Sequence, residues 1–149
     1  MCFCRTSTGP RLFLLISLLL TGPVLAFSVV AQSSNGVLRE VYLNITGGAV
    51  TDLTSHPSFP ASPSLESIQP TFEAPTEFAE NYGQRIRALL VPPGTGAYTF
   101  WMASDDNGAL FLSTTDQPAQ KVQIATVNSW TSSREWTKEP NQKSAPVNL

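Results

Sequence analysis

Apolar and polar residues alternate along several segments of the chain, and this period of two predicts β-strands. The alternation is clear in Val37–Leu43, in Gln84–Val91 and in Lys121–Val127. Residues Ala145–Leu149 indicate the start of one more strand, and Pro, Gly, Ser and Thr separate the segments. Beyond residue 31, the sequence has no helical period of useful length. We therefore predict an all-β domain in which each strand pairs with its neighbour in the chain, as in a meander.

The most informative segment is Tyr98–Ser113 (YTFWMASDDNGALFLS), in which two alternating arms flank a polar turn. The turn residues Asp105–Gly108 are of the types that close tight hairpins, so this segment predicts a hairpin. The same residues carry carboxylate and amide oxygens, which are ligands that Ca²⁺ prefers. A turn without metal and a calcium site are both consistent with these residues.

The segment Thr51–Pro75 has a different composition, with five prolines spaced among serines and threonines. Proline has no backbone N–H to donate to a neighbouring strand, so this segment is not expected to hold a central strand. We predict a long ordered loop that covers one face of the domain.

Near the N-terminus, Leu12–Leu20 is a short apolar run that follows two arginines and precedes small residues. This layout is typical of a secretory signal peptide. A transmembrane helix is the alternative, but Gly22 and Pro23 directly after the run favour a cleaved signal. The predicted organisation is a signal peptide at 1–31, a short linker at 32–36 and a β domain at 37–149. We expect a secreted or cell-surface protein with no membrane partner after cleavage.

Both cysteines, Cys2 and Cys4, lie in the predicted signal peptide, so the mature domain would have no disulfides. The whole chain holds 9 Lys and Arg against 11 Asp and Glu. Nucleic acid and anionic membranes are poor partners for such a chain, because phosphate groups require clustered basic residues. Uncharged partners such as sugars remain open. Arg85 and Arg87 are expected to point outward and to form ordinary surface ion pairs.

Three motifs occur together and in a fixed order: NYGQRIR at 81–87, PGTGAYTFWMASDDNGALFLS at 93–113 and WTSSREW at 130–136. In this combination the chain resembles the anthrax protective-antigen-type module, the PA-fourteen domain, over Gly36–Leu149. The resemblance implies an antiparallel two-sheet β-barrel or sandwich. It also implies an extracellular module of the kind attached to glycosidases, adhesins and toxins. The family pattern continues beyond residue 149, so the resemblance implies a domain whose last strands are missing at its C-terminus.

In sugar-binding members of this family, two successive aspartates joined by a cis peptide hold Ca²⁺, and the ion binds vicinal sugar hydroxyls. Carried onto this sequence, the metal ligands are Asp105 and Asp106, and Asn107 adds an oxygen. Trp101 is added to the expected ligand-binding set because its aromatic ring is suited to stack on the apolar face of a sugar. The partners that the resemblance implies are glycans or cell-surface polysaccharide, with calcium as the cofactor.

Trp101, Trp130 and Trp136 are the three tryptophans of the chain. Their rings are suited to stack on the apolar faces of sugars, but we expect core packing, because aromatic residues of this size are mostly buried. The only histidine, His56, stands before a proline, and with no cysteine left after maturation we expect no catalytic nucleophile arrangement. Asn44-Ile45-Thr46 is a glycosylation sequon.

These observations favour a non-catalytic, lectin-like carbohydrate-binding module. A structural or protein-interaction module without metal is the first alternative, and a fragment of a larger secreted glycosidase is the second. The aspartate pair separates the first two interpretations, because only the carbohydrate-binding module requires calcium there.

Overall fold

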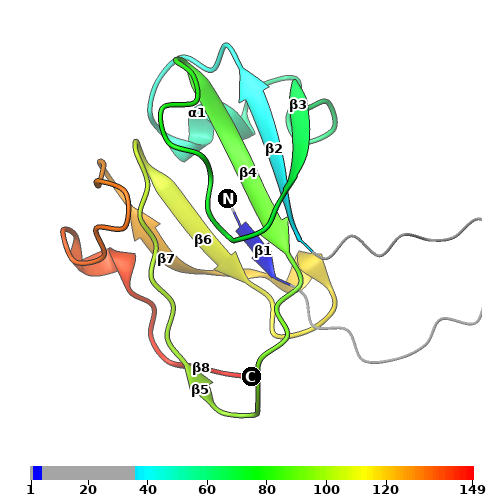
Figure 1. The fold of residues 1–149 in the computed structure, drawn as a ribbon, viewed down its shortest axis with the longest axis vertical. Helices are drawn as coiled ribbons and strands as arrows, with labels where there is room; N and C mark the ends of the chain where they lie inside the picture. The colour runs from blue at the N-terminus through cyan, green and yellow to red at the C-terminus, as the bar shows by residue number, and fades with distance from the viewer. Residues whose placement is uncertain (1, 5–35) are drawn as a thin grey trace, which may run out of the picture.

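The computed structural model describes residues 2–4 and 36–149 (Figure 1). Most of the regular secondary structure in the described chain is β-strand, which confirms the all-β prediction. The strands are β1 (Cys2–Cys4), β2 (Val37–Leu43), β3 (Leu65–Gln69), β4 (Tyr82–Ala88), β5 (Ala97–Tyr98), β6 (Gly108–Leu112), β7 (Val122–Val127) and β8 (Val147–Asn148). One short α-helix, α1 (Val50–Thr54), and two 3-10 turns, Pro118–Gln120 and Pro140–Gln142, accompany them.

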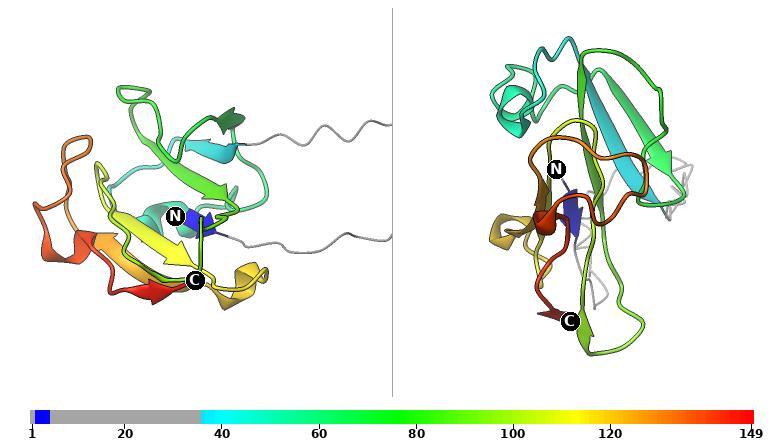
Figure 2. Two further views of the ribbon diagram at one scale, coloured as in Figure 1. Left: turned by 60° about the horizontal axis from the view of Figure 1, so that its bottom comes forward. Right: turned by 90° about the vertical axis from the view of Figure 1, so that its left-hand side faces the viewer.

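Six strands form one sheet in the order β3-β2-β4-β1-β6-β7, and β5 pairs with β8 in a second, small sheet. Pairing is antiparallel except at β1, which runs parallel to both β4 and β6. Figure 2 shows β2, β3 and β4 on one side of β1, and β6 and β7 on the other. Across the described residues the large sheet is open, with β3 and β7 as its edges, so the closed-barrel form of the prediction is not observed.

The predicted signal peptide and linker lie outside the described residues, apart from Cys2–Cys4 and Gly36. The backbone of Cys2–Cys4 forms β1, with Cys2 opposite Ile86 of β4 and Leu110 of β6. In the parts of the chain that the structure describes, no helix has the length and apolarity needed to cross a membrane.

Local alternation predicted some strands well. The segment Val37–Leu43 is confirmed as β2, and β7 begins one residue after the predicted start. The strand predicted at Gln84–Val91 begins two residues earlier, at Tyr82, and ends three residues earlier, at Ala88. The predicted loop Thr51–Pro75 is wrong in part, because it contains α1 and the edge strand β3, which pairs with β2. Pro63 and Pro70 flank that strand, so neither removes one of its hydrogen bonds.

The predicted hairpin in Tyr98–Ser113 is wrong. Its left arm, β5, pairs with β8, and its right arm, β6, pairs with β7. The segment between the arms finds its backbone partners elsewhere: Met102 N–H donates to the Gln142 carbonyl at 3.0 Å. The meander is wrong at the same place, because β4 pairs with β2 and β1 and not with β5. Long-range partners have replaced the local ones that a tight turn would use.

A small aromatic and aliphatic cluster holds α1 against the large sheet. Tyr42, Ile45 and Leu53 are almost fully buried, and Phe59 packs against them. The Tyr42 and Phe59 rings lie 5.3 Å apart between centroids, and the Tyr42 hydroxyl donates to the Pro60 carbonyl at 3.1 Å. The cluster therefore joins β2, α1 and the loop that follows the helix.

Glu40 is buried beside this cluster and binds two arginines from the neighbouring strand. Only 2% of Glu40 is exposed, and it lies opposite Arg85 in the β2–β4 pairing. Arg85 donates from Nε and Nη2 at 2.5 and 2.7 Å, and Arg87 donates from Nε and Nη2 at 3.0 and 3.1 Å. The prediction of an outward-pointing surface pair is wrong for Arg85, which is 8% exposed and has a buried carboxylate partner. Arg87 is exposed as predicted, although it binds the same buried carboxylate.

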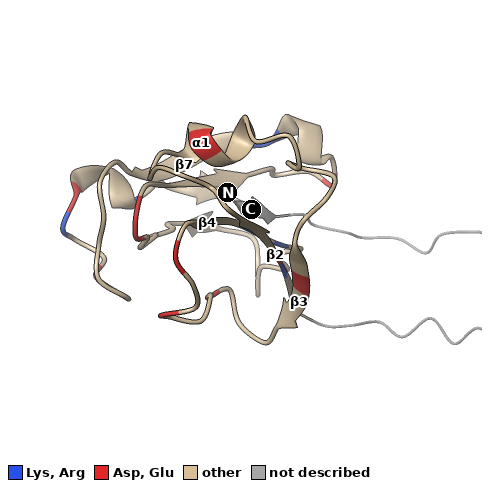
Figure 3. Ribbon diagram, turned by 90° about the horizontal axis from the view of Figure 1, so that it is seen from above, with Lys and Arg blue, Asp and Glu red and all other residues tan. Residues whose placement is uncertain are grey.

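A second ion pair provides a contrast at the surface. Arg134 donates to Glu73 at 2.7 and 3.0 Å, and their side chains are 71% and 40% exposed. Figure 3 shows that the acidic positions are spread over α1, β3 and several loops. Solvent screens such an exposed pair, so we expect it to contribute far less to stability than the Glu40 cluster.

Burial alone would raise the pKa of Glu40, but the hydrogen bonds and charges of Arg85 and Arg87 outweigh it, and the pKa lies below its usual value. A carboxylate with a lowered folded-state pKa stabilises the protein above its unfolded pKa. That contribution is lost as pH falls through the lowered pKa. The cluster is therefore fully stabilising at neutral pH and weakens only in acid.

Glu40→Gln should lower the free energy of unfolding at pH 7 by about 3 to 5 kcal/mol, because it leaves two arginines beside a neutral amide. Urea unfolding followed by tryptophan fluorescence measures this. Glu73→Gln, the matched control at the surface, should change stability little. The gap between wild type and Glu40→Gln should narrow as pH falls below about 4, the usual range of a glutamate. Equal losses in the two variants would contradict this account of the cluster.

Candidate functional site

The aspartate pair lies on the loop that leads into β6. Asp105 and Asp106 are exposed, Asn107 is half-buried and Gly108 begins the strand. The peptide bond between Asp105 and Asp106 is cis. Two exposed acidic residues therefore occupy adjacent positions on one short loop, and Asn107 follows them directly.

The loop that follows β7 supports one side of the aspartate pair. Asp105 and Trp130 form an isolated antiparallel bridge. Next to it, Thr131 N–H donates to the Ser104 carbonyl at 2.8 Å, and Ser104 N–H donates to the Thr131 hydroxyl at 3.0 Å. Thr131 is only 2% exposed, so its hydroxyl is a fixed internal partner. Trp130 is thereby held next to Asp105, although 25 positions separate the two residues in the sequence.

The turn that follows β2 supports the other side. Asn107 N–H donates to the Gly48 carbonyl at 3.1 Å. A Cβ atom at Gly48 would lie 2.8 Å from Asp106 Oδ2 and 2.9 Å from its Cβ. Such distances are shorter than normal van der Waals contact, so Gly48 permits an approach that any other residue would obstruct. Gly47 precedes it with φ of 101°, a left-handed conformation that favours glycine.

A buried glutamine fixes the segment that precedes the aspartates. Gln142 is fully buried, and its side-chain amide donates to the carbonyls of Met102 and Glu135 at 2.9 and 2.5 Å. Its side-chain carbonyl accepts from Glu139 N–H at 2.6 Å. Glu139 in turn accepts from the N–H groups of Asn128 and Ser129, directly before Trp130. One network therefore positions both the aspartate loop and the tryptophan loop.

The arrangement can offer a hard cation two carboxylates. Within residues 2–4 and 36–149, no group of three or more His, Cys, Asp or Glu side chains could hold a metal ion together. Calcium takes six to eight oxygen ligands, so the two carboxylates would be completed by carbonyl or amide oxygens, water or ligand hydroxyls. A cation held in this way would keep open positions for an oxygen-rich ligand.

The expectation that the tryptophans pack in the core is wrong. Trp101, Trp130 and Trp136 are 45%, 48% and 45% exposed. They differ in their surroundings: Trp130 pairs with Asp105, and the Lys138 ammonium lies 2.9 Å from its ring centroid. Trp101, which the sequence places among the ligand residues, pairs instead with Lys143. Trp130 is therefore the aromatic residue that the fold brings to the aspartates.

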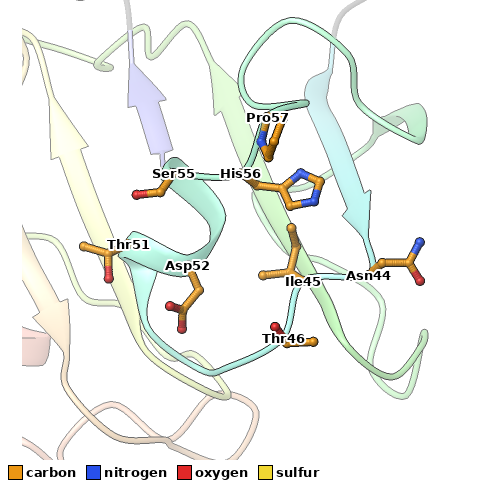
Figure 4. A pocket seen from close by; sticks show the side chains of 8 residues that line it. All are labelled: Asn44, Ile45, Thr46, Thr51, Asp52, Ser55, His56 and Pro57. Carbon is orange, nitrogen blue, oxygen red and sulfur yellow. The ribbon is translucent and has the colours of Figure 1, made fainter.

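A shallow pocket of about 410 Å³ lies at a different place, beside α1 (Figure 4). Asn44, Thr46, Asp52 and His56 are among the residues that line it, and the aspartates are not. His56 Nδ1 lies 2.7 Å from the Ser58 hydroxyl. The pocket is separate from the aspartate loop, although Gly47 and Gly48 follow the lining residue Thr46 directly in the sequence.

Sequence reasoning named Asp105, Asp106 and Asn107, but it missed the residues that hold them. Gly48, Thr131 and Gln142 were not singled out. The Thr131 hydroxyl contacts Ser104 across 27 positions, and the Gln142 side-chain amide contacts Met102 across 40 positions. The Gly47-Gly48 dipeptide was the one local sign that a close backbone approach was needed.

Comparison with known proteins gives three partial matches. Over 113 residues, 73% of the chain, the sequence is 33% identical to N-acetyl-beta-glucosaminyl-glycoprotein 4-beta-N-acetylgalactosaminyltransferase 1 of Mus musculus. Over 64 residues, 40% of the chain, it is 36% identical to fibrocystin of Mus musculus and of Canis lupus familiaris. The matched region spans 11% of the transferase and 2% of each fibrocystin. No protein-family model and no solved structure matches the chain.

Gly48→Ala should displace Asp106 and lower the free energy of unfolding by about 1 to 3 kcal/mol, because the added methyl group has no room. Thermal melting in metal-free buffer measures the loss, and NMR chemical shifts of Asp105–Gly108 report the displacement. Gly94→Ala is the matched control, since no atom lies within 4 Å of a Cβ at that position. Unchanged shifts at Asp106 in Gly48→Ala would contradict the close packing.

Proposed function

We propose that this chain is a non-catalytic glycan-binding module of protective-antigen type that holds Ca²⁺ at Asp105 and Asp106. The observation that carries the proposal is the pairing of exposed Trp130 with exposed Asp105. Two adjacent carboxylates supply the negative charge that calcium requires, and an aromatic ring beside them offers a flat apolar face. Sugars combine vicinal hydroxyls with apolar C–H faces, so both features suit one ligand class.

The match to the mouse transferase also supports a glycan-binding module. The name of the matched mouse transferase describes an enzyme that transfers N-acetylgalactosamine to N-acetylglucosaminyl groups of glycoproteins. The region shared with this chain is a small part of that enzyme. A module that recognises glycans without performing the transfer is consistent with such a partial match. We propose accordingly that the module acts outside the cytoplasm, where glycoproteins and surface polysaccharides are found.

A protein-interaction module without metal is the second candidate, and the edge strand β3 favours it. Leu65 and Ile68 on this strand are 50% and 51% exposed, and the strand has a free edge among the described residues. An exposed apolar edge strand can pair with a strand of another protein. The two candidates differ in whether stability and binding depend on calcium.

Calcium should raise the melting temperature of the wild-type domain relative to chelator, and Asp105→Asn/Asp106→Asn should abolish that shift. A ligand that binds only the folded state at 100 times its Kd adds about 2.7 kcal/mol of stability. Differential scanning fluorimetry over a calcium titration measures the effect. Asp116→Asn, which removes an exposed aspartate from another turn, should respond like wild type. Four identical melting curves for wild type and the double variant, each with and without calcium, would leave the metal-free module as the better account.

Trp130→Ala should weaken glycan binding at least about tenfold, equivalent to about 1.4 kcal/mol, without removing the calcium-dependent shift in melting temperature. Lys138 lies over one face of the ring, so a stacked sugar would displace it or use the other face. A glycan array screened with calcium identifies the ligand, and titration calorimetry with that ligand measures the change. Trp136→Ala is the control, because Trp136 is about equally exposed. Equal losses in both variants would mean that stacking next to Asp105 does not determine affinity.

A further inference from the structure

The sequence contains one tripeptide of the form Asn-x-Ser/Thr, at Asn44-Ile45-Thr46. Asn128 precedes Ser129 but has Trp130 two positions on, so it does not fit the pattern. The proposed calcium and glycan site makes no use of the tripeptide. Its place in the fold decides whether a bulky modification could be carried there.

The backbone at the end of β2 turns Asn44 toward solvent. Asn44 has φ of 62°, a left-handed conformation that asparagine tolerates better than most residues. The next residue, Ile45, is 4% exposed and belongs to the core cluster, and its N–H donates to the Asn81 carbonyl at 2.9 Å. Ile45 therefore anchors the loop, and its neighbours Asn44 and Thr46 are both exposed.

The Asn44 side chain is not needed by the fold. In the described part of the chain, its amide takes part in none of the hydrogen bonds that hold the loop. Figure 4 shows the amide pointing away from Asp52 and His56, at the outer margin of the pocket. A substituent on Nδ2 would extend into solvent without displacing a core or sheet residue.

We propose that Asn44 carries an N-linked glycan. In the transfer step, Nδ2 of Asn44 forms a bond to the anomeric carbon of an oligosaccharide donated by a lipid pyrophosphate. The bond between that carbon and the pyrophosphate oxygen breaks, the lipid pyrophosphate leaves, and Nδ2 loses one proton to solvent. A membrane-bound oligosaccharyltransferase in the secretory lumen performs this step. The proposal rests on the predicted export of the chain and is independent of calcium binding.

The glycan would lie at the same end of the large sheet as the aspartate loop. Asn44 follows the last residue of β2, and Gly48, four positions on, contacts the aspartate loop. Four residues span at most about 14 Å when fully extended. The modification therefore marks the border of the proposed ligand site and limits the directions from which a large partner can approach it.

The test is translation of the full 149-residue chain in the presence of microsomes. Wild type should give one band of lower mobility that peptide-N-glycosidase removes. Asn44→Gln and Thr46→Val should abolish the band, and Thr46→Ser should keep it, because serine completes the same tripeptide. Asn128→Gln is the matched control and should behave like wild type.

Protection from added protease shows whether the chain has entered the microsomes. A protected chain with no band of lower mobility would overturn the proposal, since the acceptor would then have met the transferase without reacting. An unprotected, unmodified chain would overturn it as well and would contradict the predicted export. Retention of the band in Asn44→Gln would also exclude this acceptor. Calcium-dependent melting of the unmodified domain tests the proposed function separately.

Discussion

The buried carboxylate of Glu40 is the interaction on which the rest of this fold depends. It binds the guanidinium groups of Arg85 and Arg87, which lie two positions apart on the same face of β4. These contacts hold β2 and β4 in one register. Each buried charge would cost several kcal/mol if left alone, and the cluster offsets that cost only with all its partners in place. A slip of one residue would separate Glu40 from Arg85 and reverse the faces of the strand.

The register of β2 and β4 also determines the position of the core cluster, which begins at the C-terminal end of β2. Tyr42 and Ile45 continue β2 into the core cluster, and the cluster holds α1. The turn between β2 and α1 places Gly48 beside the aspartate loop. There the Gly48 carbonyl accepts a hydrogen bond from the Asn107 N–H. The two exposed carboxylates are thus supported by a chain of contacts that begins at a buried ion pair. An exposed site gains its fixed geometry from residues that no ligand would touch.

Local sequence rules were sufficient for part of this picture and failed for identifiable reasons. Alternation located β2 and β7, because each has a regular pattern confined to a few adjacent residues. Alternation could not tell that Phe59 and Pro60, from the loop after α1, pack against Arg85, so that arginine was assigned to the surface. The hairpin at Tyr98–Ser113 failed because its turn residues hydrogen-bond to loops far away in the sequence.

The same limit applied to the candidate site. Adjacent aspartates are visible in the sequence, and the resemblance gave them a role. The partners that hold them, Gly48, Thr131 and Gln142, are ordinary residues whose importance arises only from their positions in space. Trp130 was expected in the core because of its size, yet nearly half of it remains exposed. Burial depends on the neighbours that the fold supplies, and residue type alone does not determine it.

The buried amide of Gln142 also bears on the order of events during synthesis. It closes contacts to Met102 and Glu135, and the neighbouring Ser144 N–H donates to the Phe100 carbonyl at 2.9 Å. A ribosome releases the chain from its N-terminal end, so β2, β4 and their ion pair can form before these residues emerge. The aspartate loop cannot take its final shape until residues 142–144 are free. The contacts that fix the exposed loop therefore form after β2 and β4 are able to pair.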